Sequence, residues 1–368
     1  VATQKGFFGV EDEFRTAFLA ENEPQLLRTP RDGVPKFANE SLIQPVTSEF
    51  TQAEEDAFID TALSLVTYDD DIWGWPQALD APAFFFNVEL FEAAGIDTTG
   101  IDADTSWTWT EFDTNTQEII DNTDAYALSL AGMFFGAQPY YYGKGAKFFT
   151  DNIYDQEHIA INSTESRDAL TYIKNLVDSN KTPTWTEQGW SYFVGDFKDG
   201  EVAMIATGPW QIQDLVENSA LFNGTTHGEE NLGMMQLPND SAGGFIGGNY
   251  YTISAHASGD EYDAAVLLAE YLTSEATSAI NNYHVPAKEA VMSNASVMAA
   301  PSYKYVSAFF EVCKNAYLHT PHELYGQLEG DFGNKINEYL SDDITLDQLI
   351  TQTIALWNED LPESAEEA

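Results

Sequence analysis

Basic residues are scarce in this sequence. Its 368 residues include 15 Lys and Arg against 60 Asp and Glu, which gives a formal net charge of −45. Nucleic acids and anionic lipids both require a basic surface, so neither is expected as a partner. A charge of this size favours a soluble monomer. The imbalance is typical either of an ordinary acidic secreted protein or of a protein adapted to high salt, where ions screen the self-repulsion.

Cysteine and long apolar runs are nearly absent. Cys313 is the single cysteine, so no internal disulfide forms. No apolar run approaches the roughly 20 residues of a membrane span. The sequence starts at Val1 without a signal peptide, which we interpret as a processed or partial chain. Five glycosylation sequons are present, which would permit modification outside the cell, at Asn39, Asn162, Asn223, Asn239 and Asn294.

The motifs of common enzymes are also missing. The sequence contains no HExxH, GxSxG or phosphate-binding loop. Among the six scattered histidines, His319 and His322 are three apart, but Pro321 lies between them and no third ligand is near. We therefore expect no metal and no cofactor. Two carboxylates suffice to cleave a glycoside, and 60 acids supply such pairs by chance, so a glycan-active enzyme stays open as an alternative.

Strand and helix patterns alternate along the chain, which predicts an α/β fold in layers. The length suits two domains. The acidic triplet at residues 69–71 has the composition of a hairpin turn. Short strands are expected at residues 25–28, 77–87 (broken at Pro82), 125–130, 202–206 and 232–237. Helices are expected at residues 10–19, 54–66, 90–94, 108–121, 167–177, 261–273, 302–316 and 345–357.

Trp210 occupies a distinctive position in this pattern. It follows the apolar strand at residues 202–206 and the sequence Thr207-Gly208-Pro209. Ligands of open α/β sheets gather outside the carboxyl ends of strands, so Trp210 is a candidate platform for a flat apolar ligand face. The alternative is a core tryptophan that anchors its domain. Trp73, Trp75 and Trp357 are assigned to packing.

The same stretch carries a resemblance to a known family. The phrase F-x-x-G-x-x-A-M-x-x-x-G-P-W is matched by Phe197, Gly200, Ala203, Met204, Gly208, Pro209 and Trp210. It resembles the extracellular sugar-binding proteins of ABC importers, the maltose-binding family. The pieces at residues 75–87, 107–112 and 270–275 follow in the order of that family, so the resemblance covers essentially the whole chain.

The resemblance implies a two-lobed, class II periplasmic-binding-protein-like fold, with a hinge and an interlobe cleft that closes on sugar. It divides the chain into a first lobe of residues 1–79 and 251–314 and a second lobe of residues 83–245 and 318–368. The chain would cross from one lobe to the other near residues 78–82, 247–251 and 315–318. The family also has a strand and a helix before the part that matches residues 10–19. We find neither here, so we expect the first lobe to lack a central strand.

The resemblance also implies a set of ligand-binding residues. A sugar presents an apolar ring face to aromatic side chains and an equator of hydroxyls to carboxylates and amides. No acid occurs between residues 130 and 142, so one hydroxyl contact is either lost or supplied by Gln138. The structural alternatives are a turn acid at Asp80, a surface ion pair at residues 31–32, and core packing for the rings. Besides Trp210, the candidates are Asp80, Arg31, Asp32, Phe134, Phe135, Tyr140, Tyr141, Asn249, Tyr250 and Tyr325.

The leading interpretation is a carbohydrate receptor, for an oligosaccharide, that delivers its ligand to the permease subunits of an ABC transporter. It would act in an extracellular or periplasmic location at the cell surface. It would contact the membrane only through the transporter or a lost lipid anchor. A receptor of the same fold for a peptide, a polyamine or a phosphodiester is the main alternative, and the acidic balance favours a cation among these.

Overall fold

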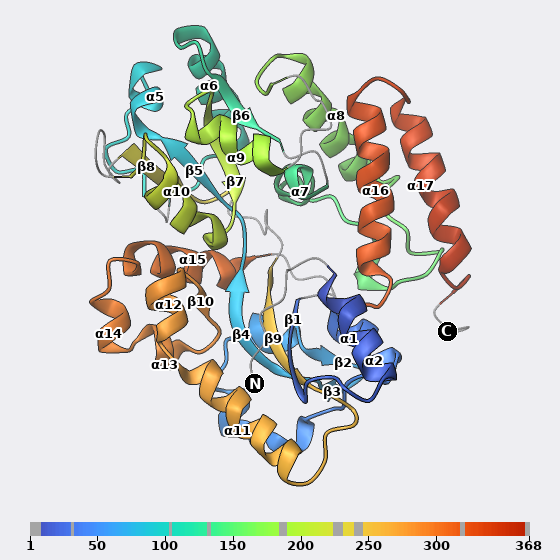
Figure 1. Ribbon diagram of the computed structural model, residues 1–368. Helices are drawn as coiled ribbons and strands as arrows, with labels where there is room; N and C mark the ends of the chain where they lie inside the picture. The colour runs from blue at the N-terminus through green and yellow to red at the C-terminus, as the bar shows by residue number, and fades with distance from the viewer. Residues whose placement is uncertain are drawn as a thin grey trace. The chain divides into compact units, whose positions relative to one another are not determined.

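The computed structural model describes residues 9–30, 33–102, 105–130, 134–183, 190–223, 231–238, 246–316 and 321–364. The chain forms two compact units (Figure 1). Unit 1 comprises residues 1–80, 247–304 and 320–326, and unit 2 comprises residues 81–246, 305–319 and 327–368. The sequence-based division had placed residues 305–314 in the first lobe, whereas their contacts belong to unit 2. Residues 317–320, near the third expected crossing, lie outside the described part.

Unit 1 is built on an antiparallel sheet of four strands. The order is β1 (Leu26–Pro30), β9 (Gly247–Ile253), β4 (Trp75–Asp80) and β10 (Val285–Pro286). The glycine-rich segment before Tyr251 is thus an inner strand, which the sequence pattern did not predict. Its glycines permit close strand contact: a Cβ at Gly248 would lie 2.3 Å from the carbonyl oxygen of Ala78.

Short helices surround this sheet. The predicted helix at residues 54–66 is divided, because Phe58 forms a β-bridge to Lys288 and the amide of Ile59 donates to the carbonyl of Ala287 at 3.0 Å. The predicted turn at residues 69–71 is a hairpin between β2 (Thr67–Tyr68) and β3 (Asp71–Ile72). The helices are α1 (Val10–Leu19), α2 (Gly33–Asn39), α3 (Gln52–Glu55), α4 (Asp60–Ser64), α11 (Asp260–Ser274), α12 (Thr277–Asn282), α13 (Glu289–Met292) and α14 (Ala295–Met298).

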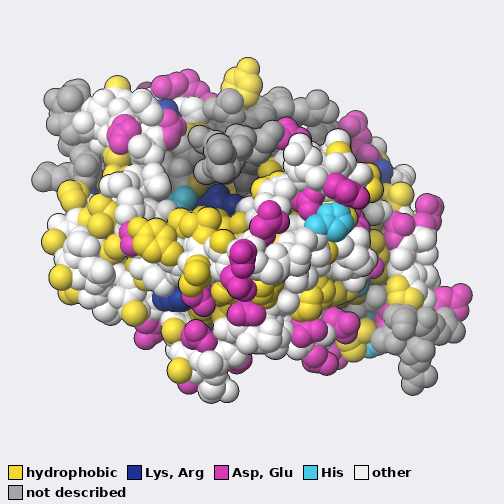
Figure 2. All heavy atoms as spheres, turned by 60° about the horizontal axis from the view of Figure 1, so that its bottom comes forward, with side chains coloured by type: hydrophobic (Ala, Val, Ile, Leu, Met, Phe, Trp, Pro, Cys, Tyr) yellow, Lys and Arg dark blue, Asp and Glu magenta, His cyan; other side chains and the backbone are white. Residues whose placement is uncertain are grey.

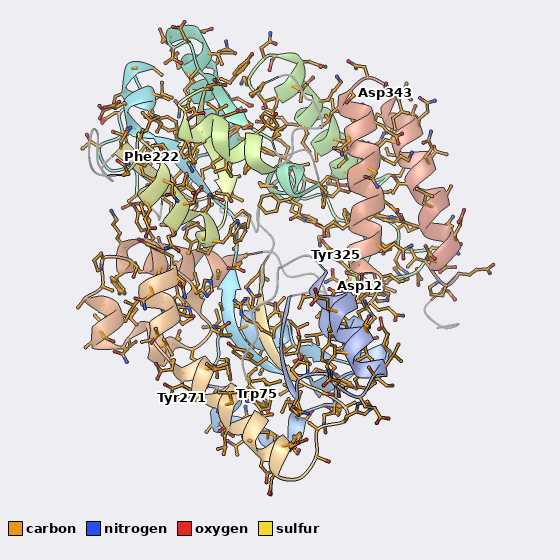
Figure 3. All side chains as sticks on the ribbon, in the orientation of Figure 1. Asp12, Trp75, Phe222, Tyr271, Tyr325 and Asp343 are labelled. Atoms are coloured by element: carbon orange, nitrogen blue, oxygen red, sulfur yellow. The ribbon has the colours of Figure 1, made fainter. Side chains whose placement is uncertain are left out.

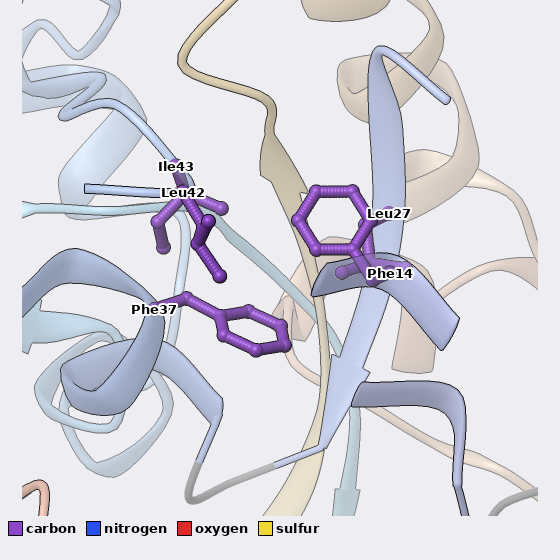
Figure 4. Packing of buried hydrophobic residues seen from close by; sticks show 5 residues of the cluster. All are labelled: Phe14, Leu27, Phe37, Leu42 and Ile43. Atoms are coloured by element: carbon purple, nitrogen blue, oxygen red, sulfur yellow. The ribbon is translucent and has the colours of Figure 1, made fainter. Parts of the chain in front are cut away.

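A hydrophobic cluster fixes α1 and α2 to the edge of the sheet (Figure 4). Phe14 on α1 and Phe37 on α2 pack with ring centroids 5.4 Å apart and planes tilted by 38°, and Leu27 contributes from β1. The apolar spacing of residues 10–19 predicted this helix, and its buried face is the one that spacing defines. The cluster consists of Phe14, Leu27, Phe37, Leu42 and Ile43.

Unit 2 contains a second sheet of four strands. Its order is β6 (Tyr126–Ser129), β7 (Val202–Thr207), β5 (Ala83–Asn87) and β8 (Leu232–Met235). Strand β7 runs parallel to β6 and antiparallel to β5. Every residue of β5 and β7 is buried, which is the pattern of inner strands covered on both faces.

Helices of unit 2 flank this sheet, and α16 and α17 run side by side (Figure 1). Thr108 and Glu111 form a capping box at the predicted start of α6. Helix α7 was not predicted, because it is apolar on all sides and includes Pro139, so it has no helical periodicity. The helices are α5 (Val88–Ala93), α6 (Trp109–Asn122), α7 (Phe134–Gly143), α8 (Thr164–Asp178), α9 (Trp190–Lys198), α10 (Ile212–Asn218), α15 (Tyr303–Asn315), α16 (Tyr325–Leu340) and α17 (Leu346–Asp360).

Replacing Phe37 tests the importance of the unit 1 cluster. Phe37→Ala removes a fully buried ring and leaves a cavity, so the free energy of unfolding should fall by about 3–5 kcal/mol. Leu19→Ala is the matched control, because Leu19 ends the neighbouring helix and is 84% exposed, and its cost should stay below about 0.5 kcal/mol. Urea unfolding curves of both variants provide the measurement. Equal losses would show that the cluster does not anchor these helices.

Candidate functional site

Trp210 lies immediately after the carboxyl end of β7. A short 3-10 helix, Pro209–Gln211, carries it, and α10 follows directly. Its indole ring folds back over Gly208, where a Cβ would lie 2.0 Å from ring atom Cζ3. The residue is 36% exposed, although most large rings in this unit are buried. Gly208 therefore lets a broad aromatic surface lie at the end of a buried strand.

A second ring extends this surface, and a polar pair lies on the same helix. Phe135 on α7 contacts the Trp210 ring, with centroids 5.9 Å apart and planes at 59°. Gln138 lies one helical turn beyond Phe135 and donates a hydrogen bond to Glu329 of α16. The structure thus places an acid from α16 beside Gln138, the residue expected to replace the missing hydroxyl contact, and Gln138 itself is buried. We call Trp210 and Phe135 the aromatic platform.

The other predicted rings of this region lie in the interior of unit 2. Phe134 packs against Phe332 of α16 at 5.2 Å, and Gly333 permits the approach because a Cβ there would lie 3.1 Å from the Phe134 amide. Tyr140 is buried among aromatic rings, and its burial raises its pKa. Tyr141 is also buried, and its hydroxyl hydrogen-bonds with Ser166 Oγ at 2.9 Å. All three rings therefore belong to the packed interior of unit 2.

Unit 1 presents a polar sheet face. The register pairs Arg28 with Tyr251 and Asp80 with Gly247, and side chains along β9 alternate between faces. Arg28, Tyr251, Asn249 and Asp80 therefore share one face, while Tyr250 points to the other face and is fully buried. Arg28 is exposed, and the other three are partly exposed. We call this set the polar face.

Hydrogen bonds across the sheet fix Arg28. Its Nε donates to Oε1 of Gln77 at 2.7 Å. Gln77 sits at a register shift in β4, and its Nε2 donates to Ser278 Oγ at 3.3 Å. His284 precedes β10 nearby, and its buried Nδ1 has no hydrogen-bond partner among the described residues. Burial, together with the Arg28 charge, lowers the pKa of His284 to about 4, so this ring is neutral at pH 7.

Asp80 ends β4 at the rim of the polar face. Burial raises its pKa to about 6, against an opposing attraction from Arg28. Burial likewise lowers the pKa of Arg28, opposed by Tyr251 and Asp80. A carboxylate desolvated in this way is poised to accept hydrogen bonds from a ligand, because these would compensate for the lost water.

The remaining predicted residues have different positions. Tyr325 is buried at the start of α16 (Figure 3), and Arg31 and Asp32 lie outside the described residues. Sequence reasoning did not select the residues that complete both surfaces. Alternation along β9 would have selected Tyr251 together with Asn249, because residues two apart on a strand lie on the same face. The residues not selected are Arg28, Gln77, Tyr251, His284 and Glu329.

Other kinds of site have little support in the described ranges. No group of three or more His, Cys, Asp or Glu side chains there could hold a metal ion. No described helix has the length and apolarity needed to cross a membrane. A hollow of about 660 Å³ lies between the end of α5 and α6 in unit 2, lined by Asp97, Trp107, Asn115 and Glu118 among others.

Comparison with known proteins identifies the family. Residues 2–279 match the sequence profile of the family described as bacterial extracellular solute-binding protein. This match covers more than half of the chain, so the chain belongs to that family. The resemblance to maltose-binding-type proteins is thereby confirmed, and the protein is a solute-binding protein and not an enzyme.

Individual relatives are distant in sequence. A galactooligosaccharide-binding protein of Bacillus subtilis (strain 168) is 22% identical over 307 residues, which span 80% of this chain and 68% of that protein. The GacH receptor of Streptomyces glaucescens GLA.O superposes with a TM-score of 0.81 at 23% identity, over 98% of this chain and 89% of that one. The sugar-binding protein MalE of Xanthomonas citri gives 0.79 at 18% identity, over 97% and 88%. The predicted α/β periplasmic-binding-protein fold is thus confirmed.

Gly208→Ala tests the origin of the platform. The added methyl group would overlap the Trp210 ring, so the ring must move while the rest of unit 2 stays folded. In a proton–nitrogen NMR spectrum, the Trp210 indole N–H signal is assigned as the one that disappears in Trp210→Phe. The chemical shift of this signal should change in Gly208→Ala. Gly195→Ala is the control, because a Cβ there meets nothing within 4 Å. An unmoved signal in Gly208→Ala would contradict the arrangement.

Asp80→Asn tests the cost of the desolvated carboxylate. The pKa of Asp80 is higher in the folded protein than its usual value of 3.8, so its ionisation destabilises the fold as pH rises from about 4 to about 6. At pH 7 the Asn variant should therefore be more stable than the wild type, by roughly 1–3 kcal/mol. Below pH 4 the difference should vanish, since Asp80 is then protonated in both states. Chemical denaturation at pH 7 and pH 3.5 measures this, and an Asn variant that is less stable at pH 7 would refute it.

Proposed function

We propose that this protein binds carbohydrate and delivers it to an ABC importer. The observation that carries the proposal is the platform at the end of β7, where the Trp210 ring lies over Gly208 and against Phe135. Flat apolar rings at this position suit the C–H face of a pyranose. Glu329 of α16, which accepts a hydrogen bond from the buried Gln138 on the same helix as Phe135, would accept hydrogen bonds from ring hydroxyls.

The polar face of unit 1 carries groups of a second kind that also suit a sugar. Asp80 is a desolvated acceptor, while Tyr251 and Asn249 offer a hydroxyl and an amide on the same side of the sheet. Carboxylates and amides of this kind recognise the hydroxyls of sugars. We assign Asp80 and Asn249 to hydroxyl binding, and we retain Arg31 and Asp32 as candidates.

Names and titles of similar proteins support a sugar ligand. They describe a receptor in complex with acarbose, a maltose-bound protein, a protein complexed with maltotetraose and a galactooligosaccharide-binding protein. An oligosaccharide is therefore the class of ligand that we propose. The protein would act outside the cell membrane, and its partners there would be the permease subunits of an ABC transporter. Closure on sugar, implied by the family resemblance, remains a prediction that solution scattering can address.

Trp210→Ala provides the main test. Thermal shift with neutral and acidic oligosaccharides of two to five units should reveal at least one sugar that raises the melting temperature. Trp210→Ala should weaken the affinity for that sugar roughly tenfold or more, because a stacked indole supplies much of the contact area. Tyr126→Ala is the matched control, since Tyr126 is an aromatic residue of the same unit with a similar exposure of 38%.

Two results would contradict the proposal. One is the absence of any stabilising sugar across the panel, with stabilisation by peptides, polyamines or phosphodiesters instead. The other is equal loss of affinity in Trp210→Ala and Tyr126→Ala, which would place the sugar away from the platform.

A further inference from the structure

Arg28 differs from the other described arginines in its partners. Arg15 donates to Glu40 at 2.7 Å and to Asp12 at 3.1 Å. Arg167 pairs with Asp347. Among the described residues, no carboxylate lies within the 4.0 Å of an ion pair to Arg28. In a chain with 60 acids and 15 bases, a guanidinium without an acidic partner is unexpected.

The guanidinium of Arg28 is held in place but incompletely hydrogen-bonded. Its Nε donates to Gln77 Oε1 at 2.7 Å, and its two Nη groups have no acceptor among the described residues. The side chain extends from an edge strand and is exposed, so a ligand can reach it. Gln77 in turn donates to Ser278, which fixes the orientation of the pair. This arrangement leaves the outer edge of a planar fork available for an anion.

Among the described residues, no group around Arg28 forms an ion pair with it, although Asp80 attracts it. Asp80 is the acidic group that faces it, but it lies beyond ion-pair distance. His284 is neutral at pH 7, and Tyr251 offers only a hydroxyl. Acidic side chains are abundant over the surface seen in Figure 2, and Lys and Arg are few. A partly desolvated cation left unpaired is unfavourable, so an anion supplied by the ligand would stabilise this face.

We propose that Arg28 binds an anionic group of the ligand, a carboxylate or a sulfate, so that the solute is an acidic oligosaccharide. This inference rests on the proposed function and adds to it the charge of the sugar. The bidentate fork of Arg28 would hold the anion, while Asn249 and Asp80 on the same face would bind neighbouring hydroxyls. The net charge of −45 opposes this ligand at long range, but salt screens that repulsion within about 8–10 Å.

A matched pair of ligands tests the charge of the sugar. Trigalacturonate and its methyl ester share one skeleton and differ in charge, and calorimetry gives the affinity for each. Sulfated carrageenan oligosaccharides separate a sulfate from a carboxylate, and maltotriose serves as the neutral reference. We expect the acidic form of at least one skeleton to bind roughly 10- to 100-fold more tightly than its neutral counterpart.

A matched pair of variants assigns that preference to Arg28. Arg28→Gln should remove most of the preference for the acidic ligand over its neutral counterpart. Arg167→Gln makes the same change in net charge, but Arg167 already pairs with Asp347. This variant should therefore retain the preference for the acidic ligand. Arg28→Lys should recover part of it, because it restores the charge without the fork.

The outcomes separate this inference from the proposed function. Tight binding of maltotriose with no gain for acidic sugars would overturn the inference and leave the carbohydrate receptor intact. An acidic preference that survives Arg28→Gln would also overturn it. Failure of every sugar, neutral or acidic, would remove both, as would a preference for cationic solutes such as polyamines.

Discussion

Strand β9 is hydrogen-bonded on both sides, to β1 and to β4, and the unit 1 site depends on this pairing. Side chains on a strand alternate between faces, so the burial of Tyr250 on one side directs Asn249 and Tyr251 to the other. The register then brings Arg28 and Asp80 to the same face from the neighbouring strands. A one-residue shift of the strand register would turn these polar groups toward the core. Burial of the hydrophobic face of the sheet therefore determines which side chains the polar face presents.

In unit 2 the candidate binding residues lie beyond the end of a strand, because the inner strand β7 has no exposed face. All six residues of β7 are buried, so a ligand contact can arise only beyond the end of the strand. Gly208 and Trp210 provide it there, since the missing side chain of the glycine leaves room for the indole. The buried rings of α7 then determine where Phe135 lies. Packing residues and a candidate ligand-binding residue are thus neighbours on one helix.

Several of the described lysines pair with acids. Lys174 contacts Asp178 at 2.7 Å, Lys198 contacts Asp214 at 3.0 Å, and Lys335 contacts Glu338 at 2.8 Å. Arg28 instead donates a hydrogen bond to the side-chain amide oxygen of Gln77. In a solute-binding protein, a cation kept free of internal acids is more consistent with ligand recognition than with stability, because exposed ion pairs contribute little to folding.

The sequence by itself determined the α/β class, the family and the position of Trp210, because apolar periodicity and a local phrase of residues encode them. It also located α6 and the hairpin at residues 69–71, where capping and turn chemistry are local. Tertiary structure alone decided the rest of the site. Glu329 reaches Gln138 across 191 positions, and Arg28 reaches Gln77 across 49. Such pairings follow from strand register and helix packing, and no local pattern records them.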